Sequence, residues 1–172
     1  MKKRVKAIIA VAVLLCAALC ALVYTRPLTI EQRYPVLDLS QCTQIRGDYY
    51  DGTGTRLTQF VIEPEDPHFD GMLELLRSVG FRTRLENLIP FPRGAQTHLA
   101  REGDFQWSVM LRFEGVQFPG GDVGSGDMLH IRNFYGKIDL SFDGEQVSCT
   151  VKDQEQWLTD VMDIITQYAV PA

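Results

Sequence analysis

The segment Phe105 to Glu114, FQWSVMLRFE, alternates without a break between two sets of five residues. A β-strand repeats every two residues, so every second side chain points to the same face of a sheet. One set is apolar throughout, and burying each of its members stabilises a fold by roughly 1.5 to 3 kcal/mol. The segment therefore predicts a strand with one buried face, formed by Phe105, Trp107, Val109, Leu111 and Phe113.

Two amphipathic helices are expected to cover that face. The first begins at Asp66-Pro67, where Asp66 caps the helix and Pro67 takes the first helical position, and it ends at Gly80. The second begins at Asp153, with a glutamine three residues later in a capping-box pattern, and runs to about Tyr168. Their apolar stripes are Phe69, Met72, Leu73, Leu76 and Val79 in the first, and Trp157, Val161, Ile164, Ile165 and Tyr168 in the second.

Two hairpins supply four further strands. The first joins residues 43–50 and 55–62 through the loop 51–54, and we expect Ile45 to lie opposite Phe60. The second joins residues 137–142 and 145–152 through Asp143-Gly144, a strong two-residue turn signal that sets Leu140 opposite Val147. A strand over residues 127–134 completes the set, and residues 81–85 are a candidate short edge strand.

These elements predict an α+β fold with a mainly antiparallel sheet of about six strands and two helices on one face. Their order is strand, strand, helix, four strands, helix. The expected organisation is a membrane-directed segment over residues 1–24, a spacer over 25–40 and one domain over 41–172.

The N-terminus has the composition of a membrane-directed segment. Lys2, Lys3, Arg4 and Lys6 precede eighteen residues, Ala7 to Tyr24, that contain no charge, amide or proline. The basic flank favours a cytoplasmic N-terminus and an extracytoplasmic domain. Three fates are open: an uncleaved single-pass anchor in the cell membrane, which we favour, a signal peptide whose removal would leave a secreted domain, or lipid attachment at Cys16 or Cys20.

Charge separates the two parts of the chain. The four basic residues of the leader leave 13 basic against 22 acidic residues after Tyr24, a formal charge of −9. Such a domain is expected to be repelled by phosphates, and the sequence after Tyr24 contains no basic run. Nucleic acid is therefore not expected as a partner, and neither are anionic lipid surfaces.

Two cysteines, Cys42 and Cys149, lie outside the leader. An extracytoplasmic domain permits a disulfide between them, which would stabilise the fold by roughly 4 to 5 kcal/mol in the chain-entropy model. The alternative is a buried Cys149 and a lone thiol at Cys42. The strand alternation argues against the disulfide, because Cys42 and Ile45 would point to opposite faces of the sheet unless a bulge lies between them.

This order of elements resembles a loose group of uncharacterised exported domains from Gram-positive bacteria. The shared features are the basic-apolar leader, the first hairpin, a helix start like EPEDPHFDGMLELLRSVGF, the alternating strand and a strand ending in Asp-Gly. The resemblance spans residues 43–168 and implies a structural framework without a catalytic motif.

The sequence contains no common motif for nucleophilic, metal or nucleotide chemistry, so we expect no enzyme activity and no cofactor. His68 lies among four acidic residues, which we interpret as solvated groups at a helix start rather than metal ligands. The glycine-rich loop over residues 115–127 is longer than a hairpin needs. We therefore expect it, with the turn after Tyr50, to form the rim of any binding site, with Asp122, Ser125, Asp127 and Tyr50 as candidate contacts.

The expected function is a non-catalytic binding or interaction module at the cell envelope, with an envelope protein or glycan as partner. An envelope hydrolase that uses paired carboxylates is the first alternative. A sensory or regulatory ectodomain is the second.

Overall fold

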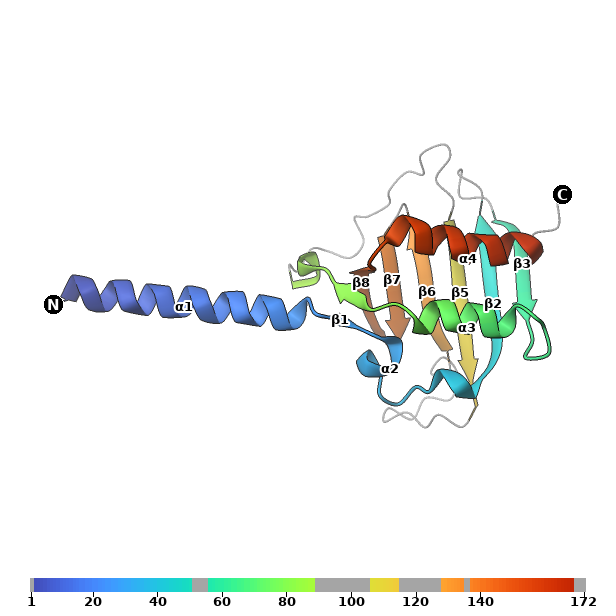
Figure 1. Ribbon diagram of the computed structural model, residues 1–172, viewed down its shortest axis with the longest axis horizontal. Helices are drawn as coiled ribbons and strands as arrows, with labels where there is room; N and C mark the ends of the chain where they lie inside the picture. Colours follow the sequence, from blue (N-terminus) through green and yellow to red (C-terminus); the bar gives the residue numbers. More distant parts are fainter. Residues whose placement is uncertain (1, 51–55, 89–105, 115–127, 135–136, 169–172) are drawn as a thin grey trace.

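The computed structural model describes residues 2–50, 56–88, 106–114, 128–134 and 137–168. A long N-terminal helix projects from an α+β domain (Figure 1). That helix, α1 (Lys2–Tyr24), contains a 20-residue apolar segment, Val5–Tyr24, of mean hydropathy 2.8, none of which is buried. By length and composition α1 fits a membrane anchor or a signal segment.

The domain contains one antiparallel sheet of eight strands, in the order β1-β4-β8-β7-β6-β5-β2-β3. The fold class was predicted correctly, whereas the count of six strands was too low. The strands are β1 (Pro27–Leu28), β2 (Cys42–Tyr50), β3 (Arg56–Ile62), β4 (Phe81–Thr83), β5 (Gln106–Phe113), β6 (Met128–Phe134), β7 (Lys137–Phe142) and β8 (Glu145–Thr150).

Helices α3 (Phe69–Arg77) and α4 (Gln154–Tyr168) cover the same face of the sheet (Figure 1). The indole nitrogen Nε1 of Trp157 donates to the backbone carbonyl of Leu75 at 3.1 Å and so joins the two helices. The predicted stripe of α3 is buried except for Val79, and that of α4 is buried at Trp157, Val161 and Ile165. The predicted apolar faces of both helices are thus confirmed.

Strand β5 contributes four side chains that are at most 1% exposed, Trp107, Val109, Leu111 and Phe113, as its alternation predicted. Phe105 lies outside the described residues. Strand β5 pairs with β2 on one side and β6 on the other. A register shift between Cys42 and Gln44 places Cys42 on the buried face with Ile45, which is the bulge that their spacing required.

The expected spacer over residues 25–40 is instead part of the domain, which corrects the predicted boundary. It forms β1, the short helix α2 (Ile30–Arg33) and the 3-10 helix η1 (Leu39–Gln41). Thr29 and Gln32 close a capping box at the start of α2. Four apolar side chains of this segment are buried in the core: Ile30, Tyr34, Leu37 and Leu39.

The first hairpin has a different register from the one predicted. Ile45 lies opposite Ile62, and Phe60 lies opposite Gly47. A Cβ atom at Gly47 would stand 2.1 Å from Cζ of Phe60, so the ring occupies the space that the glycine leaves. The shift of two residues keeps the same side chains on the buried face, which is why alternation could not detect it.

The second hairpin was predicted correctly, with Leu140 opposite Val147 and Ile138 opposite Cys149. Asp143 and Gly144 have φ angles of 46° and 75°. Two consecutive positive φ angles are typical of a type I′ turn, whose twist matches that of the flanking strands.

The predicted start of α3 needs correction. Residues 66–68 form a turn, and α3 begins at Phe69 with His68 as the capping position. The carboxylate of Asp66 nevertheless accepts a hydrogen bond from the backbone N–H of His68 at 2.9 Å. Helix α4 begins at Gln154, directly after Asp153 as predicted, and the side chain of Gln156 donates to Asp160 at 2.8 Å, one turn onward.

Candidate open-face binding site

The two faces of the sheet differ in what covers them. The helices pack on one face. We call the other the open face, and it comprises the alternate strand residues that point away from α3 and α4. Most of the open-face side chains that the structure describes are polar, and they are half-buried or exposed.

A row of polar residues crosses the middle of the open face. Register places Asp48 beside Ser108, Ser108 beside Arg132, Arg132 beside Asp139 and Asp139 beside Ser148. The hydroxyl of Ser108 donates to Oδ2 of Asp48 at 3.4 Å, and the hydroxyl of Ser148 donates to Oδ1 of Asp139 at 2.5 Å. Neighbouring strands thus hold each other's polar groups in place.

Asn87, in the 3-10 helix η2 (Leu85–Leu88), fixes the end of this row. Its side-chain amide donates to the backbone carbonyl of Ser148 at 2.8 Å, and its side-chain oxygen accepts from the N–H of Ser148 at 3.1 Å. This reciprocal pair of hydrogen bonds gives partners to the backbone carbonyl and N–H of Ser148, which lies on β8 past the point where β4 ends. Residues 89–105, which follow η2, lie outside the described residues.

The open face is richer in basic than in acidic residues, although the domain as a whole is acidic. Among the strand residues that the structure describes, the acidic members are Asp48 and Asp139. The basic members are Arg46, Arg82, Arg112, Arg132 and Lys137.

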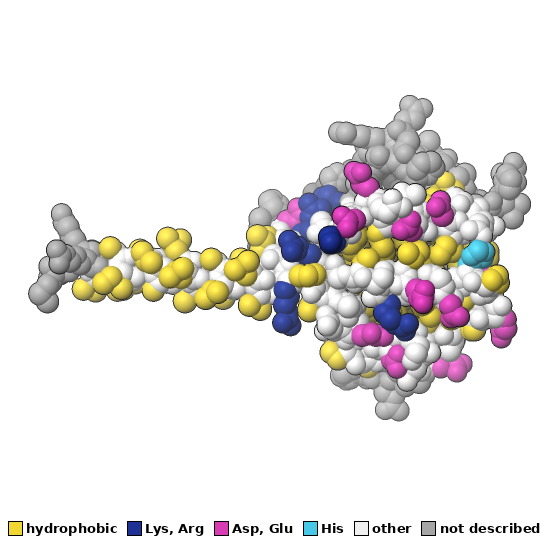
Figure 2. Space-filling model, in the orientation of Figure 1, with side chains coloured by type: hydrophobic (Ala, Val, Ile, Leu, Met, Phe, Trp, Pro, Cys, Tyr) yellow, Lys and Arg dark blue, Asp and Glu magenta, His cyan; other side chains and the backbone are white. Residues whose placement is uncertain are grey.

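The helix side has the opposite charge (Figure 2). Acidic side chains are scattered over this side in that view. The acidic residues of the two helices are Asp70 and Glu74 in α3, and Glu155, Asp160 and Asp163 in α4. Arg77, about half exposed, is the basic residue of α3. The sequence after Tyr24 shows no basic run because the open-face basic residues lie on five different strands, each between neighbours that point to the other face.

His130 lies on the open face between Met110 of β5 and Ser141 of β7. Partial burial lowers the pKa of its imidazole, and the positive charge of Arg132, two residues along the strand, lowers it further. His130 is therefore mainly neutral at pH 7, when the arginines around it are charged.

The predicted rim residues are only partly described. Tyr50 ends β2 and lies half-buried beside Gln106 of β5. Asp122, Ser125 and Asp127, and the rest of the loop 115–127, lie outside the described residues. The predicted rim is therefore not tested by the structure.

The expected disulfide is wrong, because Cys42 and Cys149 are separate free thiols. They lie on β2 and β8, four strand spacings apart, which is roughly 19 Å across the sheet against the 7 Å that a disulfide allows between Cα atoms. Both side chains are buried, and burial raises the pKa of each thiol to about 11. They are inert core residues at neutral pH.

The acidic cluster around His68 is structural. The Tyr168 hydroxyl donates to the Asp66 carboxylate, and this bond, followed by the one from the His68 N–H, lowers the pKa of Asp66. The rings of His68 and Tyr168 meet edge to face at 5.8 Å between centroids. These contacts tie the start of α3 to the end of α4. Among the described residues no three histidine, cysteine or acidic side chains are arranged to hold a metal ion.

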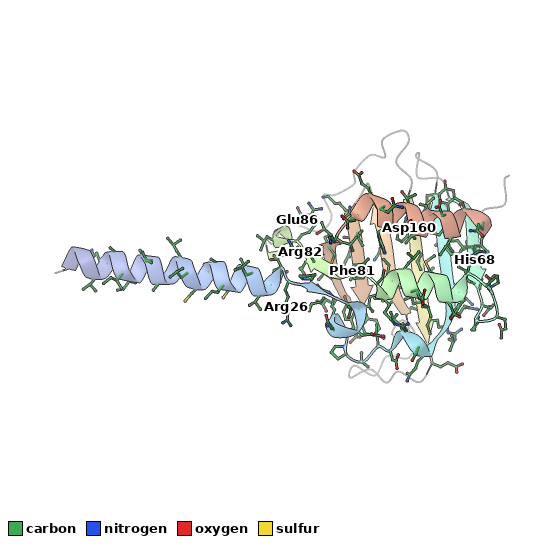
Figure 3. All side chains as sticks on the ribbon, viewed as in Figure 1. Arg26, His68, Phe81, Arg82, Glu86 and Asp160 are labelled. Carbon is green, nitrogen blue, oxygen red and sulfur yellow. The ribbon has the colours of Figure 1, made fainter. Side chains whose placement is uncertain are left out.

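Helix α1 joins the domain directly at its β1 edge. Only Thr25 and Arg26 separate α1 from β1, and their backbone N–H groups bond to the carbonyls of Ala21 and Val23 at 2.9 and 3.4 Å. Pro27 of β1 lies opposite Arg82 of β4. Arg26 and Arg82 accordingly lie at the junction between helix and domain (Figure 3).

No protein-family model, no curated protein and no solved structure matches this chain.

Proposed function

We propose that this protein is a non-catalytic binding module of the cell envelope, held at the extracytoplasmic surface of the membrane by α1, and that the open face is its docking surface. The observation behind the proposal is the unequal covering of the sheet. Two helices bury one face, while the other presents polar and charged groups. An antiparallel sheet commonly leaves one polar face to solvent, and the feature that favours docking here is the excess of basic over acidic residues on the open-face strands.

The N-terminal segment supports the location. Its apolar stretch is long enough to cross a bilayer, and the basic residues before it favour a cytoplasmic N-terminus. The two-residue link between α1 and β1 keeps the domain close to the bilayer. The partner is accordingly a component of the membrane-proximal envelope.

The arrangement of carboxylates does not favour hydrolysis on this face. Asp48 and Asp139 lie three strand spacings apart, roughly 14 Å, with Ser108 and Arg132 between them. Paired carboxylates in glycoside hydrolases are about 5 to 9.5 Å apart. Binding therefore accounts for the open face better than this type of catalysis does.

The proposal is tested with the full-length chain in lipid nanodiscs and insoluble cell-envelope material as the binding probe. Ser141→Trp places a bulky side chain on the open face, and Thr159→Trp places the same group on the exposed side of α4. We expect S141W to weaken co-sedimentation at least tenfold and T159W to leave it unchanged, with both variants retaining the wild-type circular dichroism. Equal retention of the two variants would place the site elsewhere.

The membrane location has its own test. A single cysteine at position 36, in a background without the four native cysteines, should react with a membrane-impermeant maleimide in intact cells. Val36 is exposed, so access is not limited by the fold. Labelling only after lysis would place the domain inside the membrane barrier.

A further inference from the structure

The basic residues of the open face form a diagonal band across the sheet. The band begins at Arg46 on β2 and Arg112 on β5, continues through His130 and Arg132 on β6 and Lys137 on β7, and ends at Arg82 on β4. Arg46 lies beside Met110, which lies beside His130, and Arg112 lies two residues further along β5 than Met110. The neighbouring members of the band are thus on the same or adjacent strands, except at its β4 end.

Strand geometry gives the spacing of the band. Side chains on one face repeat about every 6.7 Å along a strand, and neighbouring strands lie about 4.8 Å apart. Successive members are therefore roughly 7 to 10 Å apart at their Cα atoms, and the whole band is roughly 27 Å long. An extended ligand fits this shape better than a compact one.

The side chains of the band favour an anionic ligand. Guanidinium groups bind phosphate and carboxylate oxygens through paired N–H donors, and four of the six members are arginines. Arg46 and Arg112 are exposed. Arg46 also donates to the side chain of Gln44, which donates to Glu63 at 2.6 Å, so its guanidinium is held against the strand.

Two further features favour a polyhydroxylated polymer over an acidic protein. Asp48 and Asp139 lie within or beside the band, where they can accept hydrogen bonds from hydroxyl groups between the anionic groups of a ligand. Protein interfaces depend on large apolar or aromatic anchors. On the described part of the open face, the large apolar or aromatic residues are the half-buried Tyr50, Met110 and Met128 and the exposed Val61, which lies at the β3 edge outside the band.

We propose that the band binds a linear polyol phosphate polymer of the envelope. A polyol phosphate repeat of six backbone bonds extends about 7 Å, by the same reach per bond as an extended polypeptide. His130 is mainly neutral at pH 7, so the charged members of the band are roughly 8 to 10 Å apart, with one interval of roughly 14 Å between Arg112 and Arg132. One negative charge per repeat therefore matches these intervals at one or two repeats. This assignment rests on the proposed function, because it names the ligand class for the same open face.

The position of the band relates the ligand to the membrane. Its β4 end, at Arg82, lies opposite Pro27, three residues after the end of α1. The other end lies on β2, next to the sheet edge farthest from β1. A polymer bound along the band therefore runs from the membrane-proximal edge of the domain outward.

The experiment measures binding of the full-length chain in nanodiscs of uncharged lipid to a poly(glycerol phosphate) oligomer of about ten repeats. The double variant Arg46→Gln and Arg112→Gln removes two exposed charges of the band. Arg77→Gln removes an exposed charge from the helix side as the matched control. Polyglutamate of similar charge, inorganic phosphate and uncharged dextran are the comparison probes.

We expect poly(glycerol phosphate) to bind, with an affinity that falls as salt rises from 50 to 200 mM because surface ion pairs are screened. R46Q/R112Q should weaken binding at least tenfold, and R77Q should change it less than twofold. Inorganic phosphate, which lacks the repeat, and dextran, which lacks the charge, should each bind at least a hundredfold more weakly.

Three results would overturn the ligand assignment: no binding of poly(glycerol phosphate), equal binding by R46Q/R112Q and the wild type, or tighter binding of polyglutamate, which would indicate an acidic protein partner. The proposed function fails separately. If S141W still binds envelope material fully, the open face is not the docking surface. If S141W abolishes envelope binding while R46Q/R112Q retains it, the open face is still the docking surface, but its ligand is not a polyanion.

Discussion

Replacing Leu37 by alanine tests whether residues 25–40 belong to the fold. Leu37 is 3% exposed, whereas its neighbour Val36 is 47% exposed. A buried leucine truncated to alanine destabilises a domain by about 2 to 5 kcal/mol, from lost transfer free energy and the cavity that remains. Val36→Ala in the same segment should cost less than about 0.5 kcal/mol.

The assay is chemical denaturation of the full-length chain in detergent, followed by tryptophan fluorescence. Trp107 and Trp157 are both buried in the core that Leu37 joins, so their emission reports unfolding of the domain. A loss of about 3 kcal/mol should also lower the melting temperature by roughly 6 to 12 °C in a domain of this size.

The comparison separates two descriptions of the segment. A spacer would tolerate both substitutions equally, because nothing in it would be packed. A segment that completes the core tolerates only Val36→Ala. A change of less than 1 kcal/mol in the free energy of unfolding for L37A would refute the packing described above.

Three further outcomes are expected. Gly47→Ala should destabilise the domain by about 3 kcal/mol or more because its Cβ would overlap the Phe60 ring, and an unchanged denaturation midpoint would contradict this. Cys42 and Cys149 should both titrate as free thiols in denaturant without reductant, and should react slowly in the native protein at pH 8 because burial raises each pKa to about 11; a mass lower by two hydrogens would reveal a disulfide instead. His130 should titrate below its ordinary pKa of about 6.5 by NMR. The unfolded chain then binds a proton at His130 more readily than the folded domain does, so this histidine makes the domain less stable as pH falls below about 6.5. His130→Gln should remove that part of the pH dependence.

The sequence alone determined the features that depend on local pattern. Alternation in FQWSVMLRFE predicted the buried strand β5, the helical stripes predicted which sides of α3 and α4 are buried, and Asp143-Gly144 predicted both a turn and its register. In each case the signal and the structure it predicts lie within one element or one turn. Steric preference and the burial of apolar side chains act there without reference to the rest of the chain.

Tertiary structure decided the features that join distant residues. The register of the first hairpin depends on the space above Gly47 that only Phe60 fills, and a shift of two residues leaves the alternation unchanged. The strand β1 has two residues, too few to show a period, and it forms because β4 offers an edge for pairing. Residues 25–40 looked like a spacer because packing in the core, rather than any local repeat, holds them.

The candidate site is also a feature that only the tertiary structure decided. Each open-face arginine or lysine occupies a polar position in its own strand, where the sequence shows only the expected alternation. Strand order and register bring these residues from β2, β4, β5, β6 and β7 to one face, and helices α3 and α4, whose charged side chains are mainly acidic, pack on the other. The separation of charge is therefore a property of the assembled sheet, since backbone pairing between distant strands, and not local sequence, sets which side chains become neighbours.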